Sequence, residues 1–345
     1  MNQWVKGFLT GLICIIYSAV NAQDIHFSQF YASPLLLNPA NTGNYDGDWR
    51  IINNDRTQWR SITVTPYNTI AIGGDMQYYI HNEKFSAGLI FVNDKSGTLG
   101  LTTNQAIFTG AWHKIIKNNS FHIGIQAGVM MVSFDSKDLT FPYDYNSDAG
   151  LYSSGYGNQI YGTDAYNFGN RIYVPIVNAG IIWNRRFRNY MPEFGLAFNN
   201  INTPNESFDP QVKQPLNIRQ NYHAACHFYL TQKVTITPRI LYSRETTVLE
   251  ELYGGNISYK IPANKFNLNS LMFGTYIRDT FSQQADAAIF IFGANIHKID
   301  IGISYDINVS NLQLASNYRG AFEISLVYTE ISTIFNKFTI PCDRY

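Results

Sequence analysis

The feature that most constrains this chain is a strict alternation of apolar and polar residues that recurs along most of its length. In "KIDIGISYDINV" the odd-numbered residues from Ile299 to Val309 are apolar, whereas the residues between them are polar or glycine. "FHIGIQAGVMM" and "AFEISLVYTE" repeat the pattern. Successive side chains of a β-strand point to opposite faces, so this alternation predicts strands with one apolar face.

The alternation predicts fourteen strands between residues 49 and 330. They cover 49–59, 67–79, 84–93, 103–115, 119–134, 172–187, 190–199, 215–230, 233–242, 250–261, 266–277, 284–293, 298–309 and 319–330. Tilted strands of about ten residues cross a bilayer, and an even number allows the sheet to close with both ends on one side. We therefore expect an all-β fold, a transmembrane outer-membrane β-barrel of about 14 antiparallel strands.

The lengths of the connections give an independent indication. Short connections such as "IHNE" and "IKNN" alternate with long ones, the longest running from Asp135 to Arg171. Outer-membrane barrels have short periplasmic turns and long external loops. Aromatic residues near the strand ends fit interfacial girdles, although ordinary β-propensity would also place them there. These residues are Trp49, Trp59, Tyr78, Tyr79, Trp112, Trp183 and Tyr328.

The N-terminus has the pattern of a signal peptide over residues 1–22. Lys6 precedes the apolar stretch "GFLTGLICIIYSAV", and small residues end at Ala22, so we expect the mature protein to begin at Gln23. Export would leave Cys226 and Cys342, for which a disulfide is permitted but not required. The formal net charge is zero, which gives no indication of a nucleic-acid partner.

Residues 23–48 contain an apolar stretch, "QDIHFSQFYASPLLLNPANTG", that has neither helix nor strand periodicity. Such a segment must be buried, and the polar lumen of a barrel offers a place for irregular backbone. We expect it to plug the lumen, and we expect residues 331–345 to form a C-terminal periplasmic tail. The candidate plug residues are Phe27, Phe30, Pro34, Leu35, Leu36, Leu37, Asn38 and Pro39.

The chain has no recognisable catalytic motif. A G-x-S-x-G elbow is absent, and His122 and His223 fit lumen positions better than a catalytic dyad. Asp300, Asp306 and Glu323 are expected to line the lumen as polar residues. We therefore expect no enzymatic activity, no cofactor and no metal site.

The long connection between residues 135 and 171 is rich in Tyr, Gly, Asn and Asp, which are common in protein-binding loops. Partner contact and a passive, solvated loop both remain open. Asp144, Asn146 and Asp148 have the spacing of a calcium loop, but no closing Glu follows, so a solvated loop is favoured. The candidate partner-binding residues are Tyr143, Asp144, Tyr145, Asn146, Asp148, Tyr152, Tyr156, Tyr161 and Tyr166.

Three blocks of the sequence resemble the PorP/SprF family of the type IX secretion system. The first block carries Gln23, Asp24, Phe27, Ser28, Gln29, Phe30, Pro34, Leu35, Asn38, Pro39 and Ala40. The second carries Arg56, Gln58, Trp59, Pro66, Tyr67, Thr69 and Asp75. The third is "SYDINVSNLQLASNYRGAFEISLVY". The family often ends in C-P-[RK]-F, whereas Asp343 follows Cys342 here.

The resemblance implies a non-enzymatic component of the Gram-negative outer membrane that supports protein secretion or gliding motility. It implies binding or anchoring of secreted surface proteins, namely adhesins with type IX C-terminal domains. It also implies contact with periplasmic ring or peptidoglycan-linked components and with outer-membrane lipid. The N-P-A element resembles fatty-acid-transporter barrels whose N-terminal segment plugs the lumen, so an outer-membrane pore or hydrophobic-solute transporter is the alternative.

Overall fold

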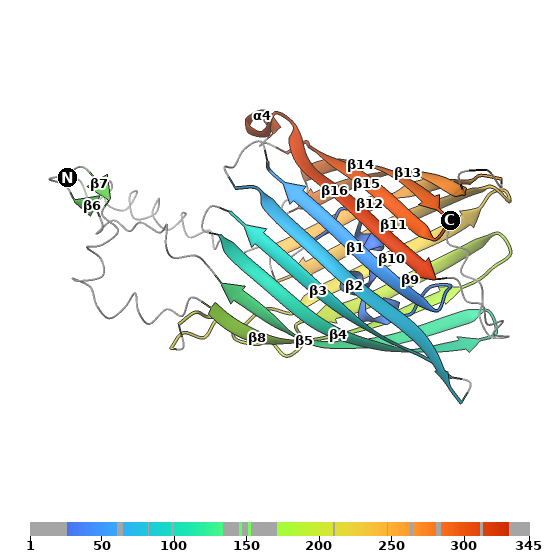
Figure 1. The fold of residues 1–345 in the computed structure, drawn as a ribbon, viewed down its shortest axis with the longest axis horizontal. Helices are drawn as coiled ribbons and strands as arrows, with labels where there is room; N and C mark the ends of the chain where they lie inside the picture. The colour runs from blue at the N-terminus through green and yellow to red at the C-terminus, as the bar shows by residue number, and fades with distance from the viewer. Residues whose placement is uncertain are drawn as a thin grey trace, which may run out of the picture.

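A computed structural model describes residues 26–330, except 61–64, 82, 98–99, 134–144, 147–150, 153–170, 210, 247, 263–264, 266, 281–283 and 311–312. Fourteen strands form a closed barrel in which sequential neighbours pair antiparallel, and β1 closes the sheet by pairing with both β2 and β16 (Figure 1). The predicted all-β barrel of 14 strands is confirmed.

The barrel strands run from one rim to the other in a simple up-and-down order. Their bounds are β1 Trp49–Gln58, β2 Tyr67–Ile80, β3 Glu83–Ser96, β4 Leu101–Ile116, β5 Asn119–Ser133, β8 Arg171–Arg185, β9 Tyr190–Asn199, β10 Arg219–Tyr229, β11 Val234–Glu245, β12 Val248–Lys260, β13 Leu268–Thr280, β14 Gln284–Ile296, β15 Ile299–Asn308 and β16 Arg319–Glu330. Two further short strands, β6 (Tyr145–Asn146) and β7 (Leu151–Tyr152), pair with each other outside the barrel.

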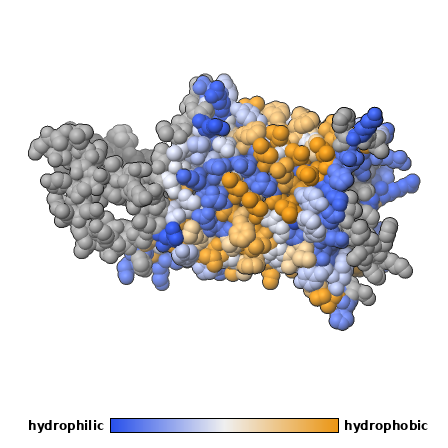
Figure 2. All heavy atoms as spheres, in the orientation of Figure 1, coloured by the Kyte–Doolittle hydropathy of each residue, from blue (hydrophilic) through white to orange (hydrophobic). Residues whose placement is uncertain are grey.

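The two faces of the wall follow the predicted alternation. On β15, Ile303 and Tyr305 are exposed on the outside, whereas Ser304 and Asp306 are buried on the inside. On β5, Ile125 is 67% exposed and its neighbour Gln126 is 3% exposed. Figure 2 shows the resulting apolar band across the middle of the visible face, with hydrophilic residues toward both rims. The outer face therefore has the polarity that a bilayer requires.

Two connections that we predicted to be long external loops are tight turns. The expected loop at residues 94–102 is reduced to four residues, because β3 extends to Ser96 and β4 begins at Leu101. The expected loop at 243–249 is reduced to two residues, because β11 and β12 pair as far as Glu245 and Val248. The backbone pairing of these strands continues beyond the residues that alternate in polarity. The alternation pattern therefore predicted strands that are too short.

The connection between β9 and β10 is longer than predicted. We expected a strand from residue 215, but β10 begins at Arg219 because Pro215 forms a bridge with Asn205 inside the loop. Phe208 and Leu216 of this loop pack against apolar side chains that line the inside of the barrel. The loop therefore folds over the lumen at the rim where β9 ends and β10 begins.

The helices of the described residues are all short. Three lie in the N-terminal segment, η1 (Phe30–Ala32), α2 (Pro34–Leu37) and η2 (Pro39–Asn41), and α4 (Gln313–Ser316) lies between β15 and β16. Within the described residues, no helix has the length and apolar character needed to cross a membrane.

Candidate functional site: the N-terminal segment inside the barrel

Residues 26–48, here called the N-terminal segment, run along the inside of the barrel before entering β1. Our expectation that residues 23–43 lack regular structure is wrong in part, because three short helices follow one another here. Pro34 and Pro39 each occupy an early helical position, where the missing N–H costs no hydrogen bond. Asn38 begins η2, and its side chain accepts a hydrogen bond from the Ala40 amide at 2.9 Å. Helices this short give no periodicity in the sequence.

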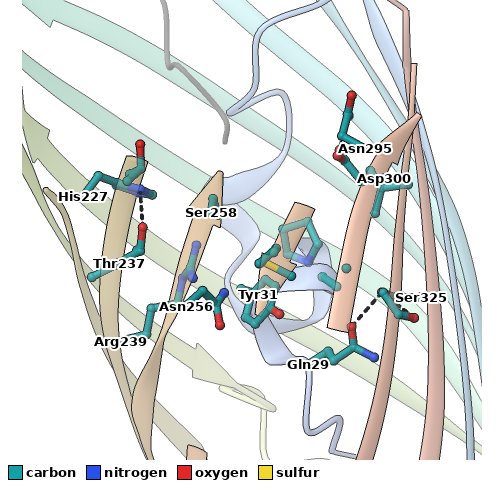
Figure 3. A pocket seen from close by; sticks show the side chains of 18 of the residues that line it. Gln29, Tyr31, His227, Thr237, Arg239, Asn256, Ser258, Asn295, Asp300 and Ser325 are labelled. Carbon is teal, nitrogen blue, oxygen red and sulfur yellow. Dashed lines mark hydrogen bonds between the residues drawn. The ribbon is translucent and has the colours of Figure 1, made fainter. Parts of the chain in front are cut away.

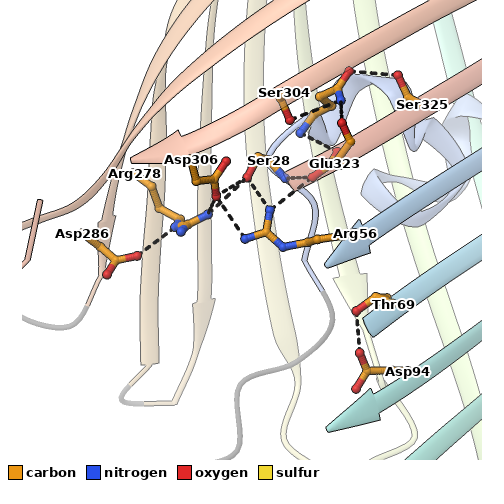
Figure 4. Close-up of polar contacts among 11 residues, drawn as sticks. Ser28, Arg56, Thr69, Asp94, Arg278, Asp286, Ser304, Asp306, Glu323 and Ser325 are labelled. Carbon is orange, nitrogen blue, oxygen red and sulfur yellow. Dashed lines mark hydrogen bonds and ion pairs between the residues drawn. The ribbon is translucent and has the colours of Figure 1, made fainter. Parts of the chain in front are cut away.

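The beginning of the segment, near the rim where β1 ends, is held by a cluster that we call the outer anchor, formed by Ser28, Arg56, Arg278, Asp306 and Glu323 (Figure 4). Arg56 lies 3.1 Å from Asp306 and 3.2 Å from Glu323, and Arg278 lies 2.9 Å from Asp306. The Ser28 amide donates to Glu323 at 2.8 Å, and its hydroxyl donates to Asp306 at 2.8 Å. All four charged side chains are almost fully buried. Buried charges require such pairing, so the segment and four strands depend on one another here.

Gln29 extends this attachment along the wall. Its amide nitrogen donates to the Ser304 hydroxyl at 3.3 Å, and its amide oxygen accepts from the Ser325 hydroxyl at 2.9 Å. A Cβ built on Gly302 would lie 2.2 Å from the Gln29 side-chain oxygen. Only glycine at position 302 leaves room for this amide.

The middle of the segment contacts the opposite side of the lumen through Asn38. The Asn38 amide donates to the carbonyls of Ile181 and Leu196 at 3.2 and 3.1 Å, and it lies 3.1 Å from Nε2 of His223. The Leu35 carbonyl accepts from the Gln126 side chain at 2.8 Å. The segment therefore crosses the lumen and bonds to strands on both sides.

The segment approaches the wall closely at two glycines, through the Pro39 backbone and the Asn38 side chain. A Cβ built on Gly124 would lie 2.3 Å from the Pro39 carbonyl carbon, and one on Gly180 would lie 2.1 Å from the Asn38 side-chain oxygen. Distances of this kind do not occur between real side chains and backbone atoms. The strand alternation alone gave no reason to connect these glycines with the segment.

The end of the segment that leads into β1 is held by a second cluster, the inner clamp, formed by Gly43, Tyr45, Arg50 and Asp75. Arg50 donates to both carboxylate oxygens of Asp75, from Nε at 2.9 Å and from Nη2 at 2.7 Å. Asp75 also accepts from the Gly43 amide at 2.7 Å, and the Tyr45 ring covers the Arg50 guanidinium at 4.3 Å. This two-bond geometry is the strongest form of ion pair between side chains.

A chain of hydrogen bonds lies beside the inner clamp. The Ser86 hydroxyl lies 2.7 Å from Nε2 of His113, and Nδ1 of His113 lies 2.6 Å from Nδ1 of His122. A serine hydroxyl that is hydrogen-bonded to a histidine has the geometry of an activated nucleophile. Ser86, however, is 2% exposed and also bonds to the Thr42 carbonyl at 2.7 Å. The segment covers this hydroxyl, so the arrangement favours attachment of the segment over reaction with a substrate.

A cavity of about 150 Å³ remains between the segment and strands β9 to β16 (Figure 3). Tyr31 and Pro34 line one side, whereas His227, Thr237 and Arg239 line the other. The Arg239 guanidinium lies 4.5 Å from the centre of the Tyr31 ring. The wall residues come from the halves of their strands that are nearest the two ends of the barrel sequence, Trp49 and Glu330, so the cavity lies in that half of the lumen.

The segment residues singled out from the sequence divide between two apolar clusters and the cavity. Phe27 and Leu35 are buried in a cluster with the inner faces of β1 to β5, β8 and β16, against which Leu36 also packs. Phe30 is buried in a second cluster with β11 to β14, and Leu37 packs against it. Pro34 lines the cavity, and Pro39 is buried beside Gly124.

Few of the predicted partner-binding residues can be placed. Tyr145, Asn146 and Tyr152 lie in the small β6–β7 sheet, where Tyr145 pairs with Tyr152. The others lie outside the described residues, as do the predicted signal peptide and C-terminal tail. Those others are Tyr143, Asp144, Asp148, Tyr156, Tyr161 and Tyr166. Among the residues that are described, no group of three or more His, Cys, Asp or Glu side chains is arranged to hold a metal ion.

Residues 19–328 match the model of the family described as type IX secretion system membrane protein PorP/SprF. The chain belongs to the PorP/SprF family. No curated protein matches its sequence significantly. This membership and the barrel fold indicate an outer-membrane protein of a secretion system, and they agree with the resemblance carried by Ser28, Gln29, Arg56 and Asp306.

Similar solved structures support the fold of this PorP/SprF protein. The TodX deltaS2S3 mutant monoaromatic hydrocarbon channel matches with a TM-score of 0.50 and 9% identity, covering 86% of this chain and 94% of the channel. The CymD monoaromatic hydrocarbon channel matches with the same score and identity, covering 88% of this chain and 94% of its own. At this identity the likeness concerns the barrel architecture alone.

Proposed function

We propose that this PorP/SprF protein is a plugged, non-enzymatic barrel that holds secreted surface proteins at the outer membrane through their type IX C-terminal domains. The observation that carries the proposal is the continuous attachment of the N-terminal segment across the lumen, from Ser28 to Tyr45. A lumen occupied in this way is poorly suited to passage of solutes. Binding at the ends of the barrel is then the remaining way to serve a secretion system.

The outer side is the proposed site of cargo binding. The sequence between β5 and β8 is rich in Tyr, Gly, Asn and Asp, and the described part of the β9–β10 loop exposes Gln211, Val212 and Lys213. Tyrosines and small polar residues supply adaptable contact area. Adhesins, including those used in gliding motility, are the proposed cargo.

The periplasmic side is the proposed site of contact with the rest of the secretion machine. Short turns and the tail at 331–345 face this side in the proposed topology, where periplasmic ring or peptidoglycan-linked components would be reached. The same topology requires export with a signal peptide cleaved after Ala22.

Co-purification tests the proposed cargo binding. The tagged protein would be extracted from native membranes in detergent, and co-purifying proteins would be identified by mass spectrometry against an unrelated barrel of similar size. We expect enrichment of at least one secreted protein with a type IX C-terminal domain, and loss of that protein when residues 145–152 are replaced by a Gly-Ser linker. Equal recovery on the control barrel would contradict the proposal.

Conductance tests the proposed plug. Deletion of residues 24–40 removes Ser28 and Asn38 but keeps Arg50 and Asp75. We expect stepwise current in planar bilayers from the deletion variant and none from the intact protein. A folded deletion variant that remains silent would sink the idea of a plug.

The alternative function is an outer-membrane pore or transporter of hydrophobic solutes. The printed names of the similar structures describe channels for monoaromatic hydrocarbons, and the outer half of this lumen is lined by apolar residues such as Ile107, Val174 and Ile176. Uptake of a monoaromatic probe into vesicles that contain the intact protein would favour this alternative. Uptake equal to that of protein-free vesicles would exclude it.

A further inference from the structure

The outer face of the wall carries an apolar groove of about 360 Å³ across β2, β3, β4, β5 and β8. This is the side of the barrel that carries β2 to β5 in Figures 1 and 2. The groove is separate from the lumen and from the external loops. Its lining consists of Ile70, Ile72, Phe91, Val92, Asn93, Asn104, Gln105, Ala106, Val129, Met131 and Tyr173.

The groove arises because a small side chain lies among large ones. Ala106 is the register partner of Phe91 on one side and of Val129 on the other, and Ile72 pairs with Phe91 beyond it. Phe91 is 52% exposed and Tyr173 is 65% exposed. The large side chains therefore stand as walls above the Ala106 methyl, which forms the floor.

A polar pair marks the outer end of the groove. The Asn93 side chain donates to the Asn104 side chain at 2.8 Å, and both lie on the outward face. Asn104 also lines the groove, and its amide nitrogen is a donor that a carbonyl oxygen there could meet. Polar side chains that face lipid are costly unless they meet a polar group.

A row of polar residues lies one step further toward the outside. Asn68, Lys95, Thr102, Ser133 and Arg171 are consecutive register partners on β2, β3, β4, β5 and β8. The alternation of the strands places all five on the outward face. Lys95 and Arg171 are exposed and three strand spacings apart, or about 14 Å. The row contains two cations and no acidic residue.

The depth of this row follows from the strands themselves. Ten residues separate Asn68 from Tyr78 on β2, and Tyr78 stacks on Phe85 near the opposite rim. Ten residues of a strand tilted by about 40° span about 25 Å along the membrane normal, the height of the apolar band of such barrels. Lys95 and Arg171 therefore lie at the level of the outer-leaflet headgroups.

We propose that the groove and the polar row bind lipid A, the phosphorylated, acylated glycolipid of the outer leaflet. An acyl chain lies over Ala106, a phosphate lies between the side chains of Lys95 and Arg171, and the Asn104 amide donates to an acyl carbonyl. The charge of the row matches a phosphorylated headgroup, and its depth matches the outer leaflet. This site depends on the barrel being in an outer membrane and does not depend on cargo binding.

Native mass spectrometry of the full chain in detergent tests the site, with bisphosphorylated lipid A and its dephosphorylated form as probes. We expect Lys95→Ala with Arg171→Ala to weaken binding of the phosphorylated form by about tenfold, because two charge-assisted contacts are lost. The double variant should leave binding of the dephosphorylated form unchanged. Ala106→Phe, which fills the groove, should weaken binding of both forms.

Matched controls keep the outcome interpretable. Lys233→Ala with Lys260→Ala removes two cations at the opposite rim, and Ala288→Phe adds the same bulk on the outward face of β14. Both should bind lipid A as the parent does, and all variants should keep the heat-dependent gel shift of a folded barrel. Equal binding of both lipid forms by the parent would overturn the proposal. Unchanged binding of phosphorylated lipid A by the Lys95/Arg171 variant would also overturn it. The same holds if Ala106→Phe keeps its lipid A but loses a co-purifying protein, because the groove would then bind a protein.

Discussion

The two ends of the N-terminal segment are held by buried ion pairs that differ in how far apart their residues lie in the sequence. The inner clamp joins Arg50 and Asp75, which lie on adjacent strands and are 25 residues apart in the chain. The outer anchor joins Arg56 to Glu323, 267 residues away, across the seam where β1 meets β16. The clamp needs only the first hairpin, whereas the anchor needs a closed barrel. The outer anchor therefore couples the position of the segment to barrel closure.

The clamp and the anchor also differ in how completely their polar atoms are paired. Both carboxylate oxygens of Asp75 accept hydrogen bonds from Arg50. In the anchor, Asp306 Oδ2 accepts from Ser28, Arg56 and Arg278, whereas no described group bonds to Asp306 Oδ1. The anchor is thus the less satisfied cluster and the one more sensitive to loss of a member.

The largest expected effect follows from Arg56→Met. Loss of this guanidinium leaves Glu323 without a cation and Asp306 with Arg278 alone. Removing one partner of a buried ion pair costs about 3–5 kcal/mol. We expect a loss of this size in the free energy of unfolding, measured by urea titration in detergent micelles.

A second substitution separates charge from packing at the same site. Arg56→Met combined with Glu323→Gln removes the uncompensated charge, so the pair should be more stable than Arg56→Met alone. A coupling energy above about 1 kcal/mol is expected for residues in direct contact. Strict additivity of the two substitutions would show that the anchor does not act as a unit.

Much of the fold was readable from the sequence, because strand alternation has a local physical cause. Ile303 and Ser304 take opposite faces as predicted, and each of the fourteen expected strands is present. The anchor was not readable in the same way. Asp306 and Glu323 were expected to be simple lining, yet both pair with Arg56. These side chains meet because of the strand register in the closed barrel. That register cannot be predicted from the spacing of residues in the sequence.

The contacts of the segment were hidden for a similar reason. Its apolar composition indicated burial, but its helices are of three or four residues and have no periodicity to detect. Gly124 and Gly180 were the available signal, since a glycine on the inner face of a strand often marks a close approach of other backbone. The sequence alone does not identify the segment that approaches these glycines, because glycines occur in strands for other reasons as well.

A methyl group at Gly124 is expected to have the next largest effect. In Gly124→Ala the new carbon meets the Pro39 backbone at 2.3 Å, where neither partner can rotate away. Overpacking of this kind costs about 1–3 kcal/mol. The segment should be displaced before the barrel unfolds, so limited proteolysis from the periplasmic side should cut it faster.

Gly110→Ala is the matched control for the methyl group added in Gly124→Ala. It lies on β4, next to β5, and the nearest atom to its new methyl group is the Ser86 carbonyl at 3.7 Å. We expect no change in proteolysis rate and little change in stability. Equal effects at Gly110 and Gly124 would show that the strands, and not the segment, respond to the added carbon.

Asn38→Ala should have a smaller effect, because it removes hydrogen bonds without leaving a buried charge. The variant loses the bonds to the Ile181 and Leu196 carbonyls and the cap of η2. We expect a loss of about 1–2 kcal/mol, the range for a cap or a buried hydrogen bond. Asn38→Asp is the sharper variant, since it keeps the cap but cannot donate to the two carbonyls. Stability equal to the parent in Asn38→Asp would assign the whole effect to the cap.

The smallest expected effect lies at the rim where β14 joins β15, at which Lys298 pairs with Glu330 in partial exposure. Solvent-exposed pairs contribute little, so Lys298→Met should lower the melting temperature less than any change inside the barrel.

The hydrogen bond to Glu330 raises the pKa of Lys298 above its ordinary value. A raised lysine pKa stabilises the fold below the ordinary value, and this contribution is lost as the pH rises through the folded-state pKa. The melting temperatures of parent and Lys298→Met should therefore differ at neutral pH and converge at alkaline pH. Lys233→Met, which removes an exposed cation elsewhere, is the control, and its melting temperature should match that of the parent. A difference that persists at alkaline pH would mean that the Lys298 side chain acts by packing and not by charge.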